Sequence, residues 1–314
     1  MLTAATIINR ALQMAKAPHY TSQALDMLNS ILSDLCETYD FALARGLFEF
    51  DFIPGLLSNY GSGPYTLPLD YLRASGSSGS EGWQKSFFWS LNGVPYPMVP
   101  VDLAEFDMQV QQAGLQSYPW LWATDMANYS AYTSSRYVLS TTAALTASNA
   151  QITIASTASL QVGYGVAGEG IVSGSTIETV DSATQVTLST APTVTFAAAS
   201  VFFGISPVGY AYPPPSGAYP VTIRYQRMMP PITDTAKIPW FPNEDFLITK
   251  LAARMMDISD DSRAREKDAQ ALATLARYIS EKDDDRTRVG TVQLDRRRVG
   301  PSMRVLPNTK QVGW

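Results

Sequence analysis

The chain has 314 residues, of which 46% are hydrophobic, so it is long enough for a buried core and about two domains. Its net charge of −5 disfavours a protein that wraps DNA with a cationic face. No apolar run reaches the roughly 18 residues of a membrane-spanning helix, and the first residues lack the pattern of a secretory signal, so neither is expected. The single cysteine, Cys36, excludes an internal disulfide and is expected to be a small buried residue.

The chain opens with two segments of helical periodicity. Residues 3–17 place apolar side chains three and four apart, with Thr3 at the position of an N-cap. A second amphipathic helix is expected to start at Thr21 or Ser22 and to stop at Gly46. Two such helices with a short joint predict a helical hairpin.

The hydrophobic period then changes from that of a helix to that of a strand. Residues 47–53 alternate apolar and polar, as a half-buried strand does. A turn is expected at 61–64 and a short strand at 65–68. The pair Asn92-Gly93 predicts a hairpin between two apolar runs, and residues 101–114 return to helical spacing.

Residues 138–204 differ from their surroundings because they contain no Lys or Arg. Ser, Thr, Ala, Val and Gly dominate, and short β-rich runs alternate with turns, which predicts a small β-sandwich inserted into the β region. After this segment aromatic residues become frequent again, and residues 221–225 alternate apolar and polar side chains, as a strand does. The strands predicted within the insert are 151–154, 170–174, 176–180 and 185–188.

The last part of the chain combines a helical pattern with a basic tail. Asn243 is placed to cap a helix, and apolar residues at helical spacing run from 246 to 279 as one buried face. Within this pattern, Asp260 or Asp261 is expected to cap a segment that ends at Tyr278. The tail, 286–314, has seven basic residues against one acid and too little apolar surface to fold alone, so we expect it to be disordered or ordered by a partner.

The predicted class is α+β, with a helical-bundle core, a β domain, an inserted β-sandwich and an extended C-terminal tail. The predicted divisions are 1–46 (helical hairpin), 47–137 (first part of the β domain), 138–204 (insert), 205–239 (return of the β domain), 240–285 (long core helix region) and 286–314 (tail).

Two stretches partly match the residue pattern of a functional motif but lack other features that the motif requires. Residues 163–168 space their glycines as a dinucleotide-binding loop does, but no helix is predicted after them. Residues 257–268 resemble a calcium loop, yet Ser262 and Asp268 stand where that loop needs Gly and Glu. With one His and one Cys, ordinary zinc sites are excluded, so we expect no metal and no cofactor.

No catalytic constellation is indicated either. His19 is the only histidine, and no nucleophile elbow accompanies it. Carboxylates such as Glu37, Glu49, Asp51 and Glu105 have no spacing that singles out a pair, so the chain is predicted not to be an enzyme.

The order of several short stretches resembles the head-to-tail adaptor (connector) proteins of short-tailed bacteriophages, which attach beneath the portal ring. The resemblance covers residues 1–137 and 205–314 and leaves the insert outside the basic pattern. The stretches that carry it are 24–29, 65–73, 223–225, 238–242, 292–300 and 306–310.

This resemblance implies a homo-oligomeric ring, usually of twelve subunits, in the neck of a virion assembled in the host cytoplasm. Its partners would be the portal protein, a tail tube or nozzle protein, and genomic DNA that passes through the channel without sequence-specific binding. The tail residues expected to dock on the portal are Leu294, Arg296, Arg297, Arg298, Arg304, Val305, Leu306, Lys310 and Trp314. The residues expected at subunit or tail interfaces are Trp89, Trp120, Trp122 and Trp240.

Other functions fit parts of the pattern. Another ring component of the neck or tail, such as a tail-tube or terminator protein, would be built without a long basic tail. A virion-associated peptidoglycan hydrolase would need a pair of carboxylates, and no pair stands out. A glycan-binding adhesin would depend on the insert alone.

Overall fold

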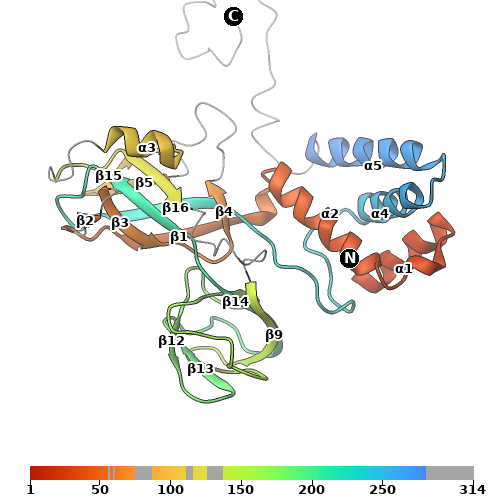
Figure 1. The fold of residues 1–314 in the computed structure, drawn as a ribbon, viewed down its shortest axis with the longest axis horizontal. Coiled ribbons are helices and arrows are strands. Elements are labelled where there is room, and N and C mark those ends of the chain that lie inside the picture. Colours follow the sequence, from red (N-terminus) through yellow and green to blue (C-terminus); the bar gives the residue numbers. More distant parts are fainter. Residues whose placement is uncertain (56, 59–60, 75–86, 111–115, 126–136, 281–314) are drawn as a thin grey trace, which may run out of the picture. The chain divides into compact units, whose positions relative to one another are not determined.

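The computed structural model describes residues 1–55, 57–58, 61–74, 87–110, 116–125 and 137–280. The protein is mixed α+β, which confirms the predicted class at that level (Figure 1). The chain divides into two compact units, Met1–Leu43 with Pro231–Trp314, and Ala44–Pro230. We call them the helical unit and the β unit.

The helical unit is built around α4, whose sequence is apolar on several sides. It packs against the other three α-helices of the unit, and Asn243 caps it as predicted, accepting from the Phe246 N–H at 3.0 Å. A helix that is apolar all round is buried all round. The helices are α1 (Ala4–Ala15), α2 (Ala24–Thr38), α4 (Glu244–Ile258) and α5 (Ala264–Tyr278), with short 3-10 turns η1 (Pro18–Tyr20) and η2 (Ala42–Ala44), the latter at the junction with the β unit. The buried residues of α4 are Phe246, Leu247, Ile248, Thr249, Leu251, Ala252, Ala253, Met255 and Met256.

The first helix was predicted correctly and the ends of the second were not. Thr3 caps α1 by accepting from the Thr6 N–H. By contrast, α2 begins at Ala24 without a side-chain cap, because the Thr21 hydroxyl donates to the carbonyl of Pro18 at 2.6 Å and closes the preceding turn. The helix ends at Thr38, well before the glycine expected to stop it.

The single helical pattern predicted from 246 to 279 is two helices. The break lies at Asp260, which has a left-handed backbone (φ 54°). Asp261 accepts from both the backbone and the side chain of Arg263, and the side-chain hydrogen bonds lower the pKa of Asp261 to about 2. It thus stabilises the turn before α5 rather than capping the helix, although α5 does end at Tyr278 as predicted.

The second half of that pattern, which forms α5, is also less buried than predicted. Among the residues of α5, only Ala264, Ala271 and Leu275 are buried. Leu272 is 46% exposed. Alanines at 269, 273 and 276 are exposed with it, so α5 carries an apolar stripe that the described residues leave uncovered.

Three sheets make up the described part of the β unit. The first has the order β1-β16-β5-β6, with β4 also paired to β16, and the second has the order β2-β3-β15-β8-β7, with α3 (Leu103–Gln109) beside β8. Their strands are β1 (Arg45–Asp51), β4 (Tyr71–Ala74), β5 (Phe87–Leu91), β6 (Val94–Pro97) and β16 (Pro220–Arg227), then β2 (Leu57–Ser58), β3 (Gly61–Thr66), β7 (Val99–Val101), β8 (Leu121–Asp125) and β15 (Val208–Tyr212).

An aromatic core fills the space between these strands. Trp122 packs against Phe87 at 4.6 Å between ring centroids, and its indole approaches the backbone of Gly209 so closely that a Cβ there would lie 1.9 Å away. Gly46 faces the ring of Tyr225 in the same way, at 2.6 Å for a built Cβ. The glycine expected to stop a helix therefore lets β1 approach an aromatic ring.

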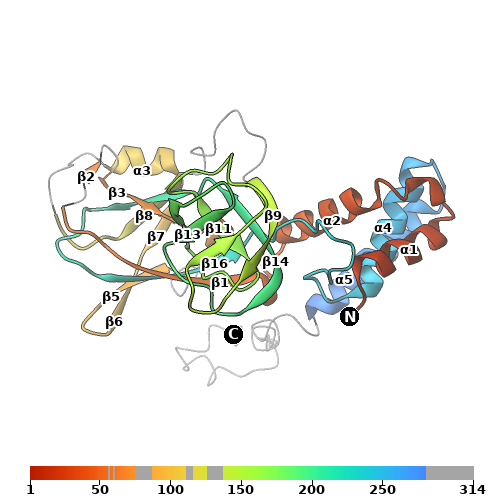
Figure 2. The same ribbon diagram turned by 90° about the horizontal axis from the view of Figure 1, so that it is seen from below.

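Most of the local structure predicted from the sequence of this unit is observed, but one predicted turn is not. The Asn92-Gly93 hairpin is confirmed, with both residues at positive φ between β5 and β6, and the hairpin projects from its unit (Figure 2). The strands predicted at 47–53 and 221–225 and the helix within 101–114 are also present. The turn predicted at 61–64 is wrong, because these residues form most of β3 and pair with β2 and β15.

The third sheet comprises β9 (Tyr137–Leu145), β10 (Gln151–Thr153), β11 (Gly165–Gly168), β12 (Ile177–Val180), β13 (Gln185–Leu188) and β14 (Phe196–Gly204). Its order is β11-β14-β9-β10-β13-β12. Of the predicted strands, the one at 170–174 is wrong, because these residues form turns and irregular chain between β11 and β12.

The third sheet also closes on itself, so two separate facing sheets are not observed. The Gly163 N–H donates to the Ile177 carbonyl, the Ile177 N–H to Tyr164 and the Val166 N–H to Ser175, each at 2.8 Å. These bonds join the two ends of the strand order, and the predicted sandwich is not confirmed. Its apolar residues line one enclosed core. We call residues 137–204 the rolled sheet.

Candidate functional site

An exposed aromatic surface lies at the β5–β6 hairpin. Trp89 is fully buried, and the rings of Tyr96 and Tyr118 stack on it at 4.6 and 5.5 Å, nearly parallel. Its indole N–H donates to the Pro119 carbonyl at 2.8 Å, which holds the segment before β8 against the hairpin. The outer members are open to solvent: Tyr96 is 41%, Tyr118 55% and Trp120 46% exposed.

This aromatic surface (Tyr96 and Tyr118 stacked on Trp89, with the exposed Trp120 two residues after Tyr118) favours packing by side chains. The neighbouring edge strand β6 carries Pro95 and Pro97, which have no N–H to offer to a further strand. None of these residues is charged. Exposed Trp and Tyr held rigid by a buried partner are typical of the anchor residues of protein interfaces.

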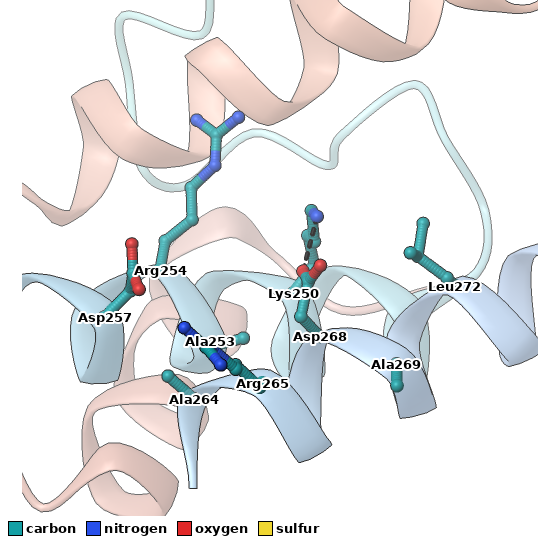
Figure 3. Close-up of a pocket in the computed structure, with 9 residues that line it drawn as sticks. All are labelled: Lys250, Ala253, Arg254, Asp257, Ala264, Arg265, Asp268, Ala269 and Leu272. Atoms are coloured by element: carbon teal, nitrogen blue, oxygen red, sulfur yellow. Dashed lines mark hydrogen bonds and ion pairs between the residues drawn. The ribbon is translucent and has the colours of Figure 1, made fainter. Parts of the chain in front are cut away.

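A groove lies between α4 and α5, with a volume of about 430 Å³. Figure 3 shows Lys250 of α4 and Asp268 of α5 meeting across it, with Nζ and Oδ1 2.5 Å apart, while Arg254 points toward α2. Arg254 forms an ion pair with Asp34 and donates to the Ser30 hydroxyl at 2.8 Å. The residues that line the groove are Lys250, Ala253, Arg254, Asp257, Ala264, Arg265, Asp268, Ala269 and Leu272.

The chemistry of this groove is that of a helix contact. Its lining has no histidine, cysteine or hydroxyl nucleophile. Two of its three basic side chains are held in ion pairs that link helices. The groove, whose lining includes the exposed Leu272, therefore indicates a surface for another helix or chain rather than a reaction centre.

A buried polar network lies in the β unit. The Asp70 side chain is 6% exposed, and its two oxygens accept from the Tyr225 hydroxyl at 2.8 Å and from Arg227 Nε at 2.7 Å. The Ser173 hydroxyl lies 2.6 Å from that of Tyr225. Because Tyr225 gives its only proton to Asp70, Ser173 is the donor in this pair.

This network contains the residue types of a catalytic proton relay, but it does not have the chemistry of one. Burial raises the pKa of Tyr225, and the Asp70 carboxylate raises it further. A tyrosine that holds its proton so firmly does not act as a base toward Ser173, so the serine is not activated. The arrangement compensates a buried charge.

The SU10 adaptor protein family model matches residues 124–298, more than half of the chain. The chain belongs to this family. It is therefore a phage adaptor-type structural protein. Comparison with the curated proteins gives no match.

The SU10 adaptor match covers different residues from the resemblance that was seen in the sequence. It runs through the rolled sheet, which the resemblance left outside the pattern, and continues over β16, α4 and α5. The aromatic surface lies before residue 124, outside the match.

The structure places the four predicted interface tryptophans in three environments. Trp89 and Trp122 are each 1% exposed and belong to the aromatic core, so they offer almost no surface to a neighbour. Trp240 packs against Phe41 and Phe241 in the helical unit. Trp120 is the one of the four that is open to solvent in the described chain.

The predicted tail residues lie outside the described part of the chain: Leu294, Arg296, Arg297, Arg298, Arg304, Val305, Leu306, Lys310 and Trp314. Within the described residues, no helix is long and apolar enough to span a membrane, and no group of three His, Cys, Asp or Glu side chains is placed to hold a metal.

Sequence reasoning missed Tyr96 and the Asp70 network. The feature that could have identified Tyr96 is its position as an aromatic residue in a proline-rich strand. The network had no local signal, since Asp70 and Tyr225 are 155 residues apart.

The network predicts a stability that falls in alkaline solution. The pKa of Tyr225 is raised above the ordinary 10.0 in the folded chain, so above pH 10 the unfolded chain loses this proton more readily and stability is lost as pH rises. Tyr225→Phe should cost about 1–3 kcal/mol at pH 7 and should flatten the fall above pH 10, measured by urea unfolding at several pH values. Burial also raises the pKa of Tyr65 and Tyr71, so part of the fall should remain. An unchanged alkaline slope in Tyr225→Phe would contradict this assignment.

Proposed function

We propose that the chain is a head-to-tail adaptor of the virion neck. Several copies form a ring, with twelve as the expected number, that docks on the portal, extends the DNA channel and receives the tail. Membership of the SU10 adaptor protein family carries this proposal. The role is structural rather than catalytic.

The contacts of the ring are proposed from the faces that the chain leaves open. The stripe of Leu272 with Ala269, Ala273 and Ala276 has the spacing of a buried helix face, yet it is exposed in the part of the chain that the structure describes. Small side chains allow close approach of another helix. We assign this stripe to contacts between neighbouring subunits.

The two other partners are assigned to different parts of the chain. The basic tail, 286–314, is proposed to dock on the portal, pairing its arginines with acids and burying Leu294, Val305, Leu306 and Trp314. The aromatic surface is proposed to receive the tail tube or nozzle protein, because rigid exposed Tyr and Trp suit a protein partner.

The role of the tail is tested by binding to assembled portal rings. A chain that ends at Thr287 should keep its circular dichroism spectrum and lose binding. Replacing Arg296, Arg297 and Arg298 by Ala should weaken binding about tenfold to a hundredfold, since each pair contributes up to about 1 kcal/mol.

A matched control replaces Arg10, Arg224 and Arg277 by Ala, which are exposed bases outside the groove between α4 and α5, with the same change in net charge. Equal binding by the full and truncated chains would move the portal contact to the helices. Binding by neither would favour a lower component of the tail.

The aromatic surface is tested by Trp120→Ala, with Leu47→Ala as a control of similar exposure (53%) elsewhere in the β unit. Both should change the free energy of unfolding by less than about 0.5 kcal/mol. Only Trp120→Ala should weaken binding of the tail-tube protein to portal rings carrying the chain, by about 30-fold or more if Trp120 is an anchor residue. Equal effects of the two substitutions would exclude Trp120 as an anchor.

A further inference from the structure

The rolled sheet needs no further contact with the rest of the β unit to remain attached. Its first and last strands are neighbours, with Tyr137 paired to Gly204, so the chain enters and leaves at one place. A module joined in this way can swing as a tethered body. Contacts away from this entry point therefore indicate whether it does.

One such contact lies in the turn between β11 and β12. Gly174 (φ +82°) presses its backbone on the ring of Phe48 in β1, where a built Cβ would lie 2.2 Å from a ring carbon. Beside it, Ser173 donates to Tyr225 of β16, whose hydroxyl is fixed in turn by the buried Asp70. An apolar contact and a polar one are thus made side by side.

A second contact involves Gly165 at the start of β11. A Cβ there would lie 3.0 Å from the Cβ of Leu69, the neighbour of Asp70, and 2.1 Å from the Ser206 hydroxyl. Both places require a glycine because another backbone or side chain fills the space that a Cβ would take. Contacts at Gly165 and at Ser173 and Gly174, together with the covalent entry, fix the orientation of a body.

We propose that the rolled sheet is a fixed extension of the β unit, docked on Phe48 and Tyr225, and that it unfolds together with the sheet of β1 and β16. Its removal would expose Phe48 and Leu69 and would open the Asp70 network to water. Residues 137–204 are then required by the rest of the β unit and are not a peripheral attachment. The inference goes beyond the adaptor role and does not rest on it.

Two glycines of the rolled sheet provide a matched test. Gly174 and Gly163 have similar backbones (φ +82° and +87°), but a Cβ on Gly163 meets nothing within 4 Å. Both substitutions to Ala bear the same backbone strain, and only Gly174→Ala disturbs the contact with Phe48.

The measurement is hydrogen exchange of the full chain, pulsed in increasing urea, comparing peptides from 137–204 with peptides from 45–52 and 219–227. In the wild type both groups should lose protection at the same urea concentration. Gly174→Ala should separate the two midpoints, whereas Gly163→Ala should leave them together. Separate midpoints in the wild type, or the same behaviour in both variants, would overturn the proposal.

A second pair of variants covers the polar contact. Ser173→Ala should lower the shared midpoint, and it should have no further effect when Tyr225→Phe is already present, because the acceptor network is then gone. The control is Ser159→Ala, because Ser159 is an exposed serine of the rolled sheet whose side chain makes no hydrogen bond with the described residues. Additive effects of Ser173→Ala and Tyr225→Phe would contradict the docking contact.

Discussion

The β unit depends on the compensation of one buried carboxylate. Asp70 stands in a chain segment with little access to water, and removing a hydrogen-bond partner from such a buried carboxylate costs about 1–3 kcal/mol. Tyr225 and Arg227 satisfy its two oxygens from the same strand, since residues two apart in a strand share a face. The strand that carries them, β16, pairs with β1, β4 and β5, so the charge is fixed by the element with the most neighbours in its sheet. Through Ser173 the same network reaches the rolled sheet.

Prediction from the sequence worked where the signal is local. Thr3, Asn243 and Asn92-Gly93 each act through hydrogen bonds or backbone angles within a few residues, and each was placed correctly. Gly46 and the 61–64 stretch were misplaced because their roles come from strands far away in sequence. In both cases a residue type typical of turns is used for close approach or strand pairing.

The helical pattern from 246 to 279 shows a different limit. Periodicity reports that a face is apolar, but not which chain covers it. In α4 the partners belong to the same chain, and the residues are buried. In α5 the stripe around Leu272 remains exposed, as a face kept for another subunit would be. The tryptophans show the same limit for aromatic residues. Sequence alone could not separate the core residues Trp89 and Trp122 from the exposed Trp120.

The proposed adaptor function would use each of these surfaces: α5 would face a neighbouring subunit, the aromatic surface would face the phage tail, and the basic C-terminal segment would reach the portal. The most direct test is electron cryomicroscopy of purified portal rings mixed with the full chain. The account predicts a closed ring of copies, coaxial with the portal, with an open channel continuous with that of the portal and density for 286–314 on the portal surface. Portal rings without added density, or copies bound singly away from the axis, would contradict it.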